Sequence, residues 1–357
     1  MHLVEEHYYT SINKTFLKLL GIWPHDRSRL VFWQRVLVIT LTVTYIILQL
    51  SVFITKNYNM VLFVKTMSFA FPSILITLKY CAFMFKSKTI KILHHYIQED
   101  WKMIQNKSEN DIMEKEAHDC QNYIIFIFME YFIAQDNYFY IIALHEFFII
   151  SLYAAMISST GTQLLLFTYH SFGMFKIASH RMKHSIDDHV LHMPNCERTI
   201  CEKIIHVVIA HRRAIEFSNI LTSSFNVPYC LIAILGVLSL SVNIFRFVQA
   251  ITLTKDMDDI FVSFTATMGH IIYMFVANYI GQKATDYNNN IFKLVYGTSW
   301  YLMPVTSQKL ILFLLSRTGK DFYYTIGFIF VAKIENFALL VNTALSYVAV
   351  MYSVQSK

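Results

Sequence analysis

The stretch at residues 36–55 reads VLVITLTVTYIILQLSVFIT and contains no charged side chain. An α-helix needs about 20 mostly apolar residues to cross the hydrocarbon core of a bilayer. Lipid offers no hydrogen-bond partner to the backbone, whereas a helix satisfies its backbone groups within its own segment. The stretch therefore predicts a helix that spans a membrane.

Further long apolar stretches predict an all-α membrane protein. They lie at 60–85, 147–169, 227–254, 260–282 and 324–354. Lys65 and Lys79 interrupt the first of them, and we expect both side chains to extend toward a membrane interface. The composition agrees, because 55% of the 357 residues are hydrophobic and 15% are charged, against roughly 25% charged residues in soluble domains. A membrane β-barrel would instead show short alternating segments.

A seventh, shorter span is predicted between residues 121 and 146. Its apolar part, 123–134, has 12 residues and contains Glu130. Lys and Arg gather on the cytoplasmic side of membrane proteins, which provides a test of the topology. They are frequent in 1–35, 86–121, 170–217 and 283–320, and scarce in 56–59, 135–146 and 255–259. Seven spans put every basic segment inside, with the N-terminus cytoplasmic, the C-terminus extracellular and the third helix shortened.

Several motifs follow one another in a fixed order. They are GIWP at 21–24, HSFGMFKIAS at 170–179, Gly281-Gln282 with Asp286, YGTSWYLMP at 296–304, QKLILFLLSR at 308–317, ENFALL at 335–340 and TALSY at 343–347. In this order and spacing they resemble the insect odorant receptor family, most strongly from about residue 260 to the end. The segment 130–146 is shorter than the third helix and outer loop that the resemblance implies.

The resemblance implies a tuning subunit of an odorant-gated, non-selective cation channel in the plasma membrane of olfactory sensory neuron dendrites. Such a subunit binds small volatile or apolar molecules and assembles with a co-receptor into a heterotetramer. One domain, 1–357, would comprise a cytoplasmic N-terminus (1–35), helices one to six (36–282), a cytoplasmic anchor segment (283–323) and a pore-lining seventh helix (324–354). No long insert separates spans four and five, which distinguishes the chain from the co-receptor. Neither a cofactor, a metal nor a nucleic acid is implied.

The last span carries a polar stripe at helical spacing. It consists of Glu335, Leu339, Asn342, Ser346, Val350 and Ser353. These residues fall on one face of a helix. Polar groups are costly against lipid, so the face either lines a pore or is buried against neighbouring helices. By the resemblance, Val350 belongs to a hydrophobic ring that gates the pore by dewetting, and Ser353 lies just outside it.

Ligand and anchor residues can be named from the topology and the resemblance. For an apolar ligand pocket in the outer half of the bundle we name Met67, Phe71, Tyr153, Met156, Phe264 and Met268. The alternative for each is plain packing or lipid contact. For the anchor between subunits we name Tyr296, Trp300, Tyr301, Leu310 and Leu314. The alternative there is an amphipathic helix that lies on the membrane.

Three other classes fit less well. G-protein-coupled receptors have the opposite orientation, and neither Asp-Arg-Tyr nor Asn-Pro-x-x-Tyr occurs at the required positions. Gustatory receptors, the sister family, usually end in Gln-Phe, which is missing after Ser346-Tyr347. A membrane metalloenzyme would use histidine boxes, because imidazole suits iron. His180 and His184 lie four residues apart, but no His-x-x-His-His sequence occurs.

Overall fold

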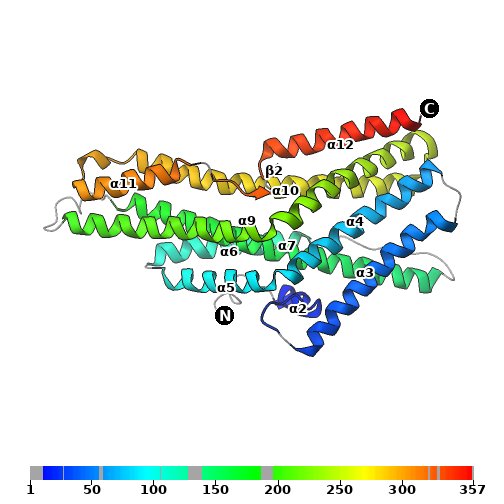
Figure 1. Cartoon of the computed structure of the whole chain (residues 1–357), viewed down its shortest axis with the longest axis horizontal. Helices are drawn as coiled ribbons and strands as arrows, with labels where there is room; N and C mark the ends of the chain where they lie inside the picture. The colour runs from blue at the N-terminus through cyan, green and yellow to red at the C-terminus, as the bar shows by residue number, and fades with distance from the viewer. Residues whose placement is uncertain are drawn as a thin grey trace.

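The computed structural model is built almost entirely of helices that run along the length of an elongated molecule (Figure 1). It describes residues 11–26, 28–55, 59–104, 106–127, 139–185, 196–320, 322–327 and 330–355. The α-helices are α2 (Ser11–Leu19), α3 (Arg29–Thr55), α4 (Met60–Phe85), α5 (Ser87–Lys102), α6 (Lys107–Ile127), α7 (Phe139–Lys183), α9 (Cys196–Gln249), α10 (Met257–Tyr296), α11 (Val305–Thr318) and α12 (Ile334–Gln355). A π-helical turn follows at Ala250–Thr254 and a 3-10 turn at Trp300–Leu302, and β1 (Thr325–Ile326) pairs antiparallel with β2 (Phe330–Val331).

Six of the described helices are long and apolar enough to cross a membrane. Each of them overlaps one of the six long stretches predicted from the sequence, and α4 begins and ends at the predicted residues. Helices α7, α9 and α10 have 45, 54 and 40 residues, well above the length that a bilayer requires. The excess length builds a second half of the molecule together with α5, α6 and α11, at the end away from α3 and α12 (Figure 1).

The predicted third span, 123–134, lies partly outside the described residues. Helix α6 enters it and ends at Ile127, and α7 begins at Phe139. The third crossing, its shortness and the orientation of the termini therefore stay predictions.

The last span begins ten residues later than predicted, at Ile334 instead of 324. The β1–β2 hairpin occupies the preceding segment, with Thr325 opposite Val331. Gly327 has a φ of +67° in the turn, a conformation that a helix does not contain. The aromatic and β-branched residues of this segment suit a strand as well as a buried helix, so apolar composition alone did not reveal the hairpin.

The hairpin and α10 approach each other closely at Gly281. A Cβ at this position would overlap Ala332, which follows β2. The backbone N–H of Ala332 donates to the carbonyl of Tyr324 at 2.9 Å and closes the base of the hairpin. Gly281 is thus required for the close approach of two backbones, which explains a glycine inside a long helix.

Buried ion pairs hold the second half of the molecule together. Arg181 on α7 donates through Nε and Nη2 to the two carboxylate oxygens of Glu109 on α6, at 2.9 Å each. The Asp100 carboxylate on α5 accepts from Arg213 on α9 and lies 2.9 Å from Nε2 of His170 on α7. Charge-assisted hydrogen bonds of this kind fix the helices relative to one another.

His94 on α5 connects the N-terminal segment to the bundle. Its Nε2 lies 2.9 Å from the Gln163 amide nitrogen, a donor, so the ring proton lies on Nδ1, 3.0 Å from Nε2 of His25. Trp23 of the GIWP motif is buried beside the same ring. Burial lowers the pKa of His94 from 6.5 to about 3, and the nearby His25 adds to this.

The pKa of His94 predicts a pH-dependent stability. Below pH 6.5 His94 becomes protonated in the unfolded chain. In the folded protein His94 stays neutral until the pH falls to about 3. The folded state should therefore lose about 2 kcal/mol by pH 5 through this group. His94→Gln should show a smaller fall in thermal unfolding temperature between pH 7.5 and 5.0 in detergent. The neighbouring His95, exposed on the same helix, provides the control His95→Gln, which should keep the wild-type fall. An equal fall in all three proteins would contradict the assignment.

Candidate functional site

A cavity of about 3230 Å³ extends between α3, α4, α7, α9 and α10 and reaches the β1–β2 hairpin. Its walls are mostly apolar and aromatic. Aromatic lining residues include Tyr45, Phe69, Tyr153, Phe225, Tyr229, Phe264 and Tyr273. Pockets for one small molecule usually measure roughly 300–1,000 Å³. The cavity therefore has room for more than one small apolar molecule, and its polar groups must select a position within it.

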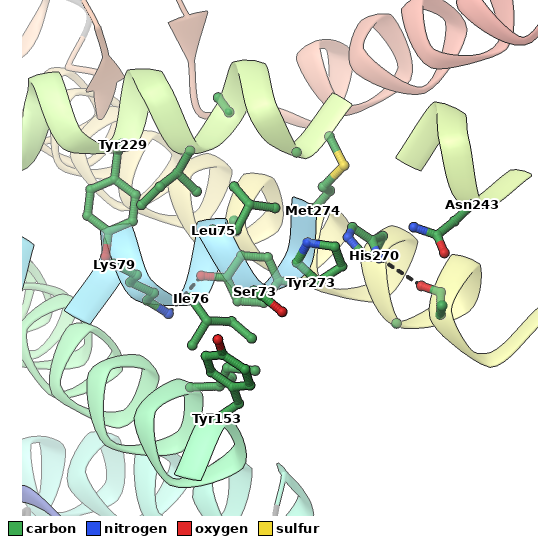
Figure 2. Close-up of a pocket in the computed structure, with 18 of the residues that line it drawn as sticks. Ser73, Leu75, Ile76, Lys79, Tyr153, Tyr229, Asn243, His270, Tyr273 and Met274 are labelled. Carbon is green, nitrogen blue, oxygen red and sulfur yellow. Dashed lines mark hydrogen bonds between the residues drawn. The ribbon is translucent and has the colours of Figure 1, made fainter. Parts of the chain in front are cut away.

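The polar groups in the part of the cavity shown in Figure 2 come from several helices. Lys79 on α4, Tyr229 on α9 and Tyr273 on α10 point toward one another (Figure 2). The Lys79 ammonium donates to the Tyr273 hydroxyl at 2.8 Å. Lys79 is only 5% exposed, so the expectation that it extends to a membrane interface was wrong. The rotation of α4 about its axis, which packing sets, turns the side chain into the bundle.

His270 on α10 is a second polar group in the wall. Its Nε2 lies 2.8 Å from the Ser239 hydroxyl on α9, and its Nδ1 lies 2.8 Å from the carbonyl oxygen of Ala266. Both ring nitrogens are therefore engaged within the subunit. His270 shapes the wall without offering a free donor to a ligand.

A charged cluster joins α4, α9 and α10. The Arg246 guanidinium donates to Oδ1 of Asp259 at 3.1 and 2.6 Å, and to the Ser68 hydroxyl at 2.6 Å. Lys65 lies 3.0 Å from Oδ2 of the same carboxylate. Lys65 is partly exposed, in contrast to the buried Lys79, and its interfacial position stays a prediction. Arg246 and Asp259 line or adjoin the cavity and are each 7% exposed.

The structure brings some of the predicted pocket residues to the cavity. Tyr153 and Phe264 line it. Met67 and Phe71 pack instead against an apolar cluster that includes Phe245 and Val348. Helix α4 thus lines the cavity with residues other than Met67 and Phe71.

Two further predicted pocket residues lie elsewhere. Met156 is fully buried in the main hydrophobic core, and Met268 on α10 is exposed. Neither is among the described residues that line the cavity. Tyr229, Tyr273 and Lys79 were not predicted from the sequence as lining residues. Helical periodicity predicts which residues share a face of a helix, but not what that face meets in the fold.

Helix α12 has two distinct faces. Phe337, Val341, Ala344 and Val348 pack on α9 and α10. The predicted stripe of Glu335, Leu339, Asn342, Ser346, Val350 and Ser353 lies opposite, and every one of its residues is exposed in the single chain. Val350 is 58% exposed. The alternative that the stripe is buried within its own bundle is therefore wrong for this chain.

The predicted anchor residues divide between the surface and the interior. Tyr296 and Tyr301 are exposed, whereas Trp300 and Leu310 are half-buried against the core. Leu314 is buried inside the subunit, so it supports α11 and does not contact a partner directly. The exposed apolar residues of α11 are Val305, Leu312 and Phe313.

Possible metal ligands are scattered over the part of the chain that the structure describes. Nowhere among them do three His, Cys, Asp or Glu side chains come together as ligands. The rings of His180 and His184 lie with their centroids 4.5 Å apart and their planes tilted by 58°. Two further histidines of this part of the sequence, His189 and His192, lie outside the described ranges.

Comparison with known proteins agrees with this architecture. The family model described as "7tm Odorant receptor" matches residues 128–345, more than half of the chain. The fold is similar to that of the olfactory receptor OR5 from Machilis hrabei in complex with eugenol, with a TM-score of 0.77, 13% identity and 99% of each chain covered. The structure of OR5 without a named ligand matches with a TM-score of 0.73, 13% identity and 96% and 97% coverage. No curated protein sequence matches the chain.

The helical bundle, the apolar cavity and the exposed polar stripe of α12 are the features of a membrane chemoreceptor. This chain belongs to the seven-helix odorant receptor family of insects. The family consists of receptors, so the metalloenzyme alternative is excluded, and the match favours the odorant branch over the gustatory one.

The cluster at Arg246 predicts a strong stability effect. Asp259→Asn would leave a buried guanidinium without its counter-charge, at a cost of about 3–5 kcal/mol. We expect a large loss of folded protein at the cell surface, measured by surface labelling and by thermal unfolding in detergent. Asp258→Asn changes the exposed neighbouring carboxylate and should have little effect. The double variant Arg246→Met/Asp259→Asn should be less destabilised than the sum of the single variants, and additive effects would argue against the pair.

Proposed function

We propose that the chain is a tuning subunit of a ligand-gated, non-selective cation channel that binds small apolar odorants. It would act in the plasma membrane of olfactory sensory neuron dendrites and assemble with a co-receptor. The exposed polar stripe of α12 carries the proposal, because it has no explanation in an isolated subunit surrounded by lipid. The distribution of basic residues supports a cytoplasmic N-terminus.

A shared pore explains the stripe. The packed face of α12 fixes the helix on its own bundle, and the stripe points away from that bundle. Four such helices around one axis would give polar walls, with Asn342 and Ser346 lining the pore and Ser353 at its outer end. Val350 would form an apolar ring that closes the pore by dewetting.

The cavity lies close to the proposed gate helix. The hairpin residues Ile326 and Phe330 line it, and so does Leu340 on α12. A molecule that enters the cavity would therefore contact the segment that leads directly into the pore-lining helix. A ligand that binds more tightly to one position of the hairpin would shift the protein toward that position. Because the hairpin leads into α12, the position of α12 would change with it.

Exposed rings support an assembly surface at the opposite end of the molecule. Tyr296 and Tyr301 are 67% and 64% exposed, and Leu312 and Phe313 lie on the neighbouring α11. Tyr and Phe are enriched in the buried centres of protein interfaces. The half-buried Trp300 and Leu310 and the buried Leu314 would hold this surface in shape.

Two observations support the tuning role and the ligand class. The link between α7 and α9 spans only residues 184–195, without the long insert that the co-receptor is expected to have. The apolar and aromatic walls of the cavity suit small apolar molecules, and the similar OR5 structure is described in complex with eugenol.

Electrophysiology tests the proposal directly. Cells that express the chain with an insect co-receptor should show cation currents during a panel of volatiles, and cells with the co-receptor alone should not show the same responses. Surface labelling in the same cells provides the control for expression. A chain that reaches the surface with the co-receptor and yet never changes the response profile would contradict the tuning role.

Val350 offers a separate test of the gate. Val350→Ala removes two carbons, about 1.5 kcal/mol of apolar contact per subunit, which corresponds to about a tenfold rise in the open fraction without ligand for each variant subunit in the channel. Leak current normalised to surface expression measures this. Leu345→Ala shortens an exposed side chain on another face of α12 and should leave the leak unchanged. An unchanged leak in assembled Val350→Ala channels would remove this residue from the gate.

A further inference from the structure

Lys79 is a buried cation without a described counter-charge. Within the described parts of the chain no carboxylate forms an ion pair with it, although Arg246, Arg213 and Arg181 each pair with one. Asp258 is the only acidic residue among the described lining residues. It precedes Tyr273, the partner of Lys79, by 15 residues on α10, about 22 Å of helix. No carboxylate among the described residues therefore neutralises this ammonium group.

We propose that Lys79 and Tyr229 form a subsite for the carboxylate of an apolar acid. This inference rests on the proposed function, because it names the class of ligand that the cavity binds. A buried charge is costly unless it is paired. A ligand carboxylate would supply the missing charge, whereas an alcohol or an ester would not.

The donors around the subsite are suitably arranged. An ammonium group has three donors, and in the described structure Lys79 gives one of them to the Tyr273 hydroxyl. The Tyr229 hydroxyl is buried, has no partner among the described residues, and faces the same point (Figure 2). Two ammonium donors and one hydroxyl donor therefore remain for the two oxygens of a carboxylate.

The surroundings leave space for such a group and its chain. Gly161 on α7 carries no side chain beside the ammonium, and the nearest atom to a Cβ built there is Lys79 Nζ at 3.9 Å. Leu75, Ile76 and Phe225 belong to the apolar walls. A carboxylate head at Lys79 would leave a hydrocarbon tail against these walls, which removes apolar surface from water.

Two sources could supply an apolar carboxylate: a short-chain volatile acid from outside, or a fatty acid from the bilayer. The recognition chemistry is the same for both, so chain length distinguishes them. Stronger binding of hexanoate or octanoate than of palmitate would identify the volatile source, and the reverse order the membrane source. Either order upholds the carboxylate subsite.

The test measures equilibrium binding of radiolabelled hexanoate, octanoate, palmitate and 1-octanol to the full chain in phosphatidylcholine nanodiscs. Lys79→Met should weaken binding of the preferred acid about 10- to 100-fold, as expected for a lost charged hydrogen bond. Lys79→Arg should keep most of the affinity, and Tyr229→Phe should cause a smaller loss than Lys79→Met. The control Lys88→Met, at an exposed lysine beyond the cavity, should bind like the wild type. Binding of 1-octanol should be almost unchanged in every variant, which also shows that each is folded.

Three outcomes would overturn the subsite. In the first, the wild type binds none of the three acids. In the second, Lys79→Met binds the acids as tightly as the wild type does. In the third, Lys79→Met loses as much affinity for 1-octanol as for the acids. Because binding is measured without current, the result is independent of channel activity. Acid binding without any odorant current would contradict only the channel, and current evoked by neutral volatiles without acid binding would contradict only the subsite.

Discussion

Pairing of buried charge is the constraint on which this helical bundle depends. Where helices meet in lipid, no hydrophobic force acts between them, so their association relies on packing and on polar contacts. In the second half of the molecule, a buried charge is likewise costly unless it is paired. The pairs Arg246–Asp259, Arg181–Glu109 and Arg213–Asp100 each join two different helices. Apolar contacts alone would allow the helices to slide and rotate against each other. Each ion pair restricts its two helices to one relative position. The long helices α7, α9 and α10 can therefore keep one arrangement over their whole length.

Lys79 stands apart from this pattern. A structural lysine could be replaced by Met at similar volume without the cost of desolvating a charge. The folded protein nevertheless keeps Lys79, and with it the cost of burying a charge, in a cavity that is otherwise suited to apolar molecules. Departures from the rule that buried charges are paired are expected mainly at functional sites. The buried charge that pairs with no described carboxylate is thus the group best placed to distinguish one apolar ligand from another.

Much of the fold could be predicted from sequence, and much of the site could not. Long uncharged stretches identify spans reliably, because the thickness of the bilayer sets their length. The spacing of Asn342, Ser346 and Val350 correctly predicted a shared face of α12. The inward direction of Lys79 depends on the rotation of α4, which long-range packing sets. The hairpin before α12 and the pairing of Arg246 with Asp259 across a turn likewise depend on tertiary contacts that composition does not encode.

The connection between cavity and α12 follows from one close contact. Gly281 allows the backbone at Ala332 to lie directly against α10, so the base of the hairpin is held on a helix that also lines the cavity. The hairpin strands, through Ile326 and Phe330, form part of the cavity wall. A ligand in the cavity would thus contact a segment that is fixed on one side and continuous with α12 on the other. On the proposed function, coupling needs no long path through the protein, because the element that senses the ligand and the element that lines the pore are neighbours in the chain.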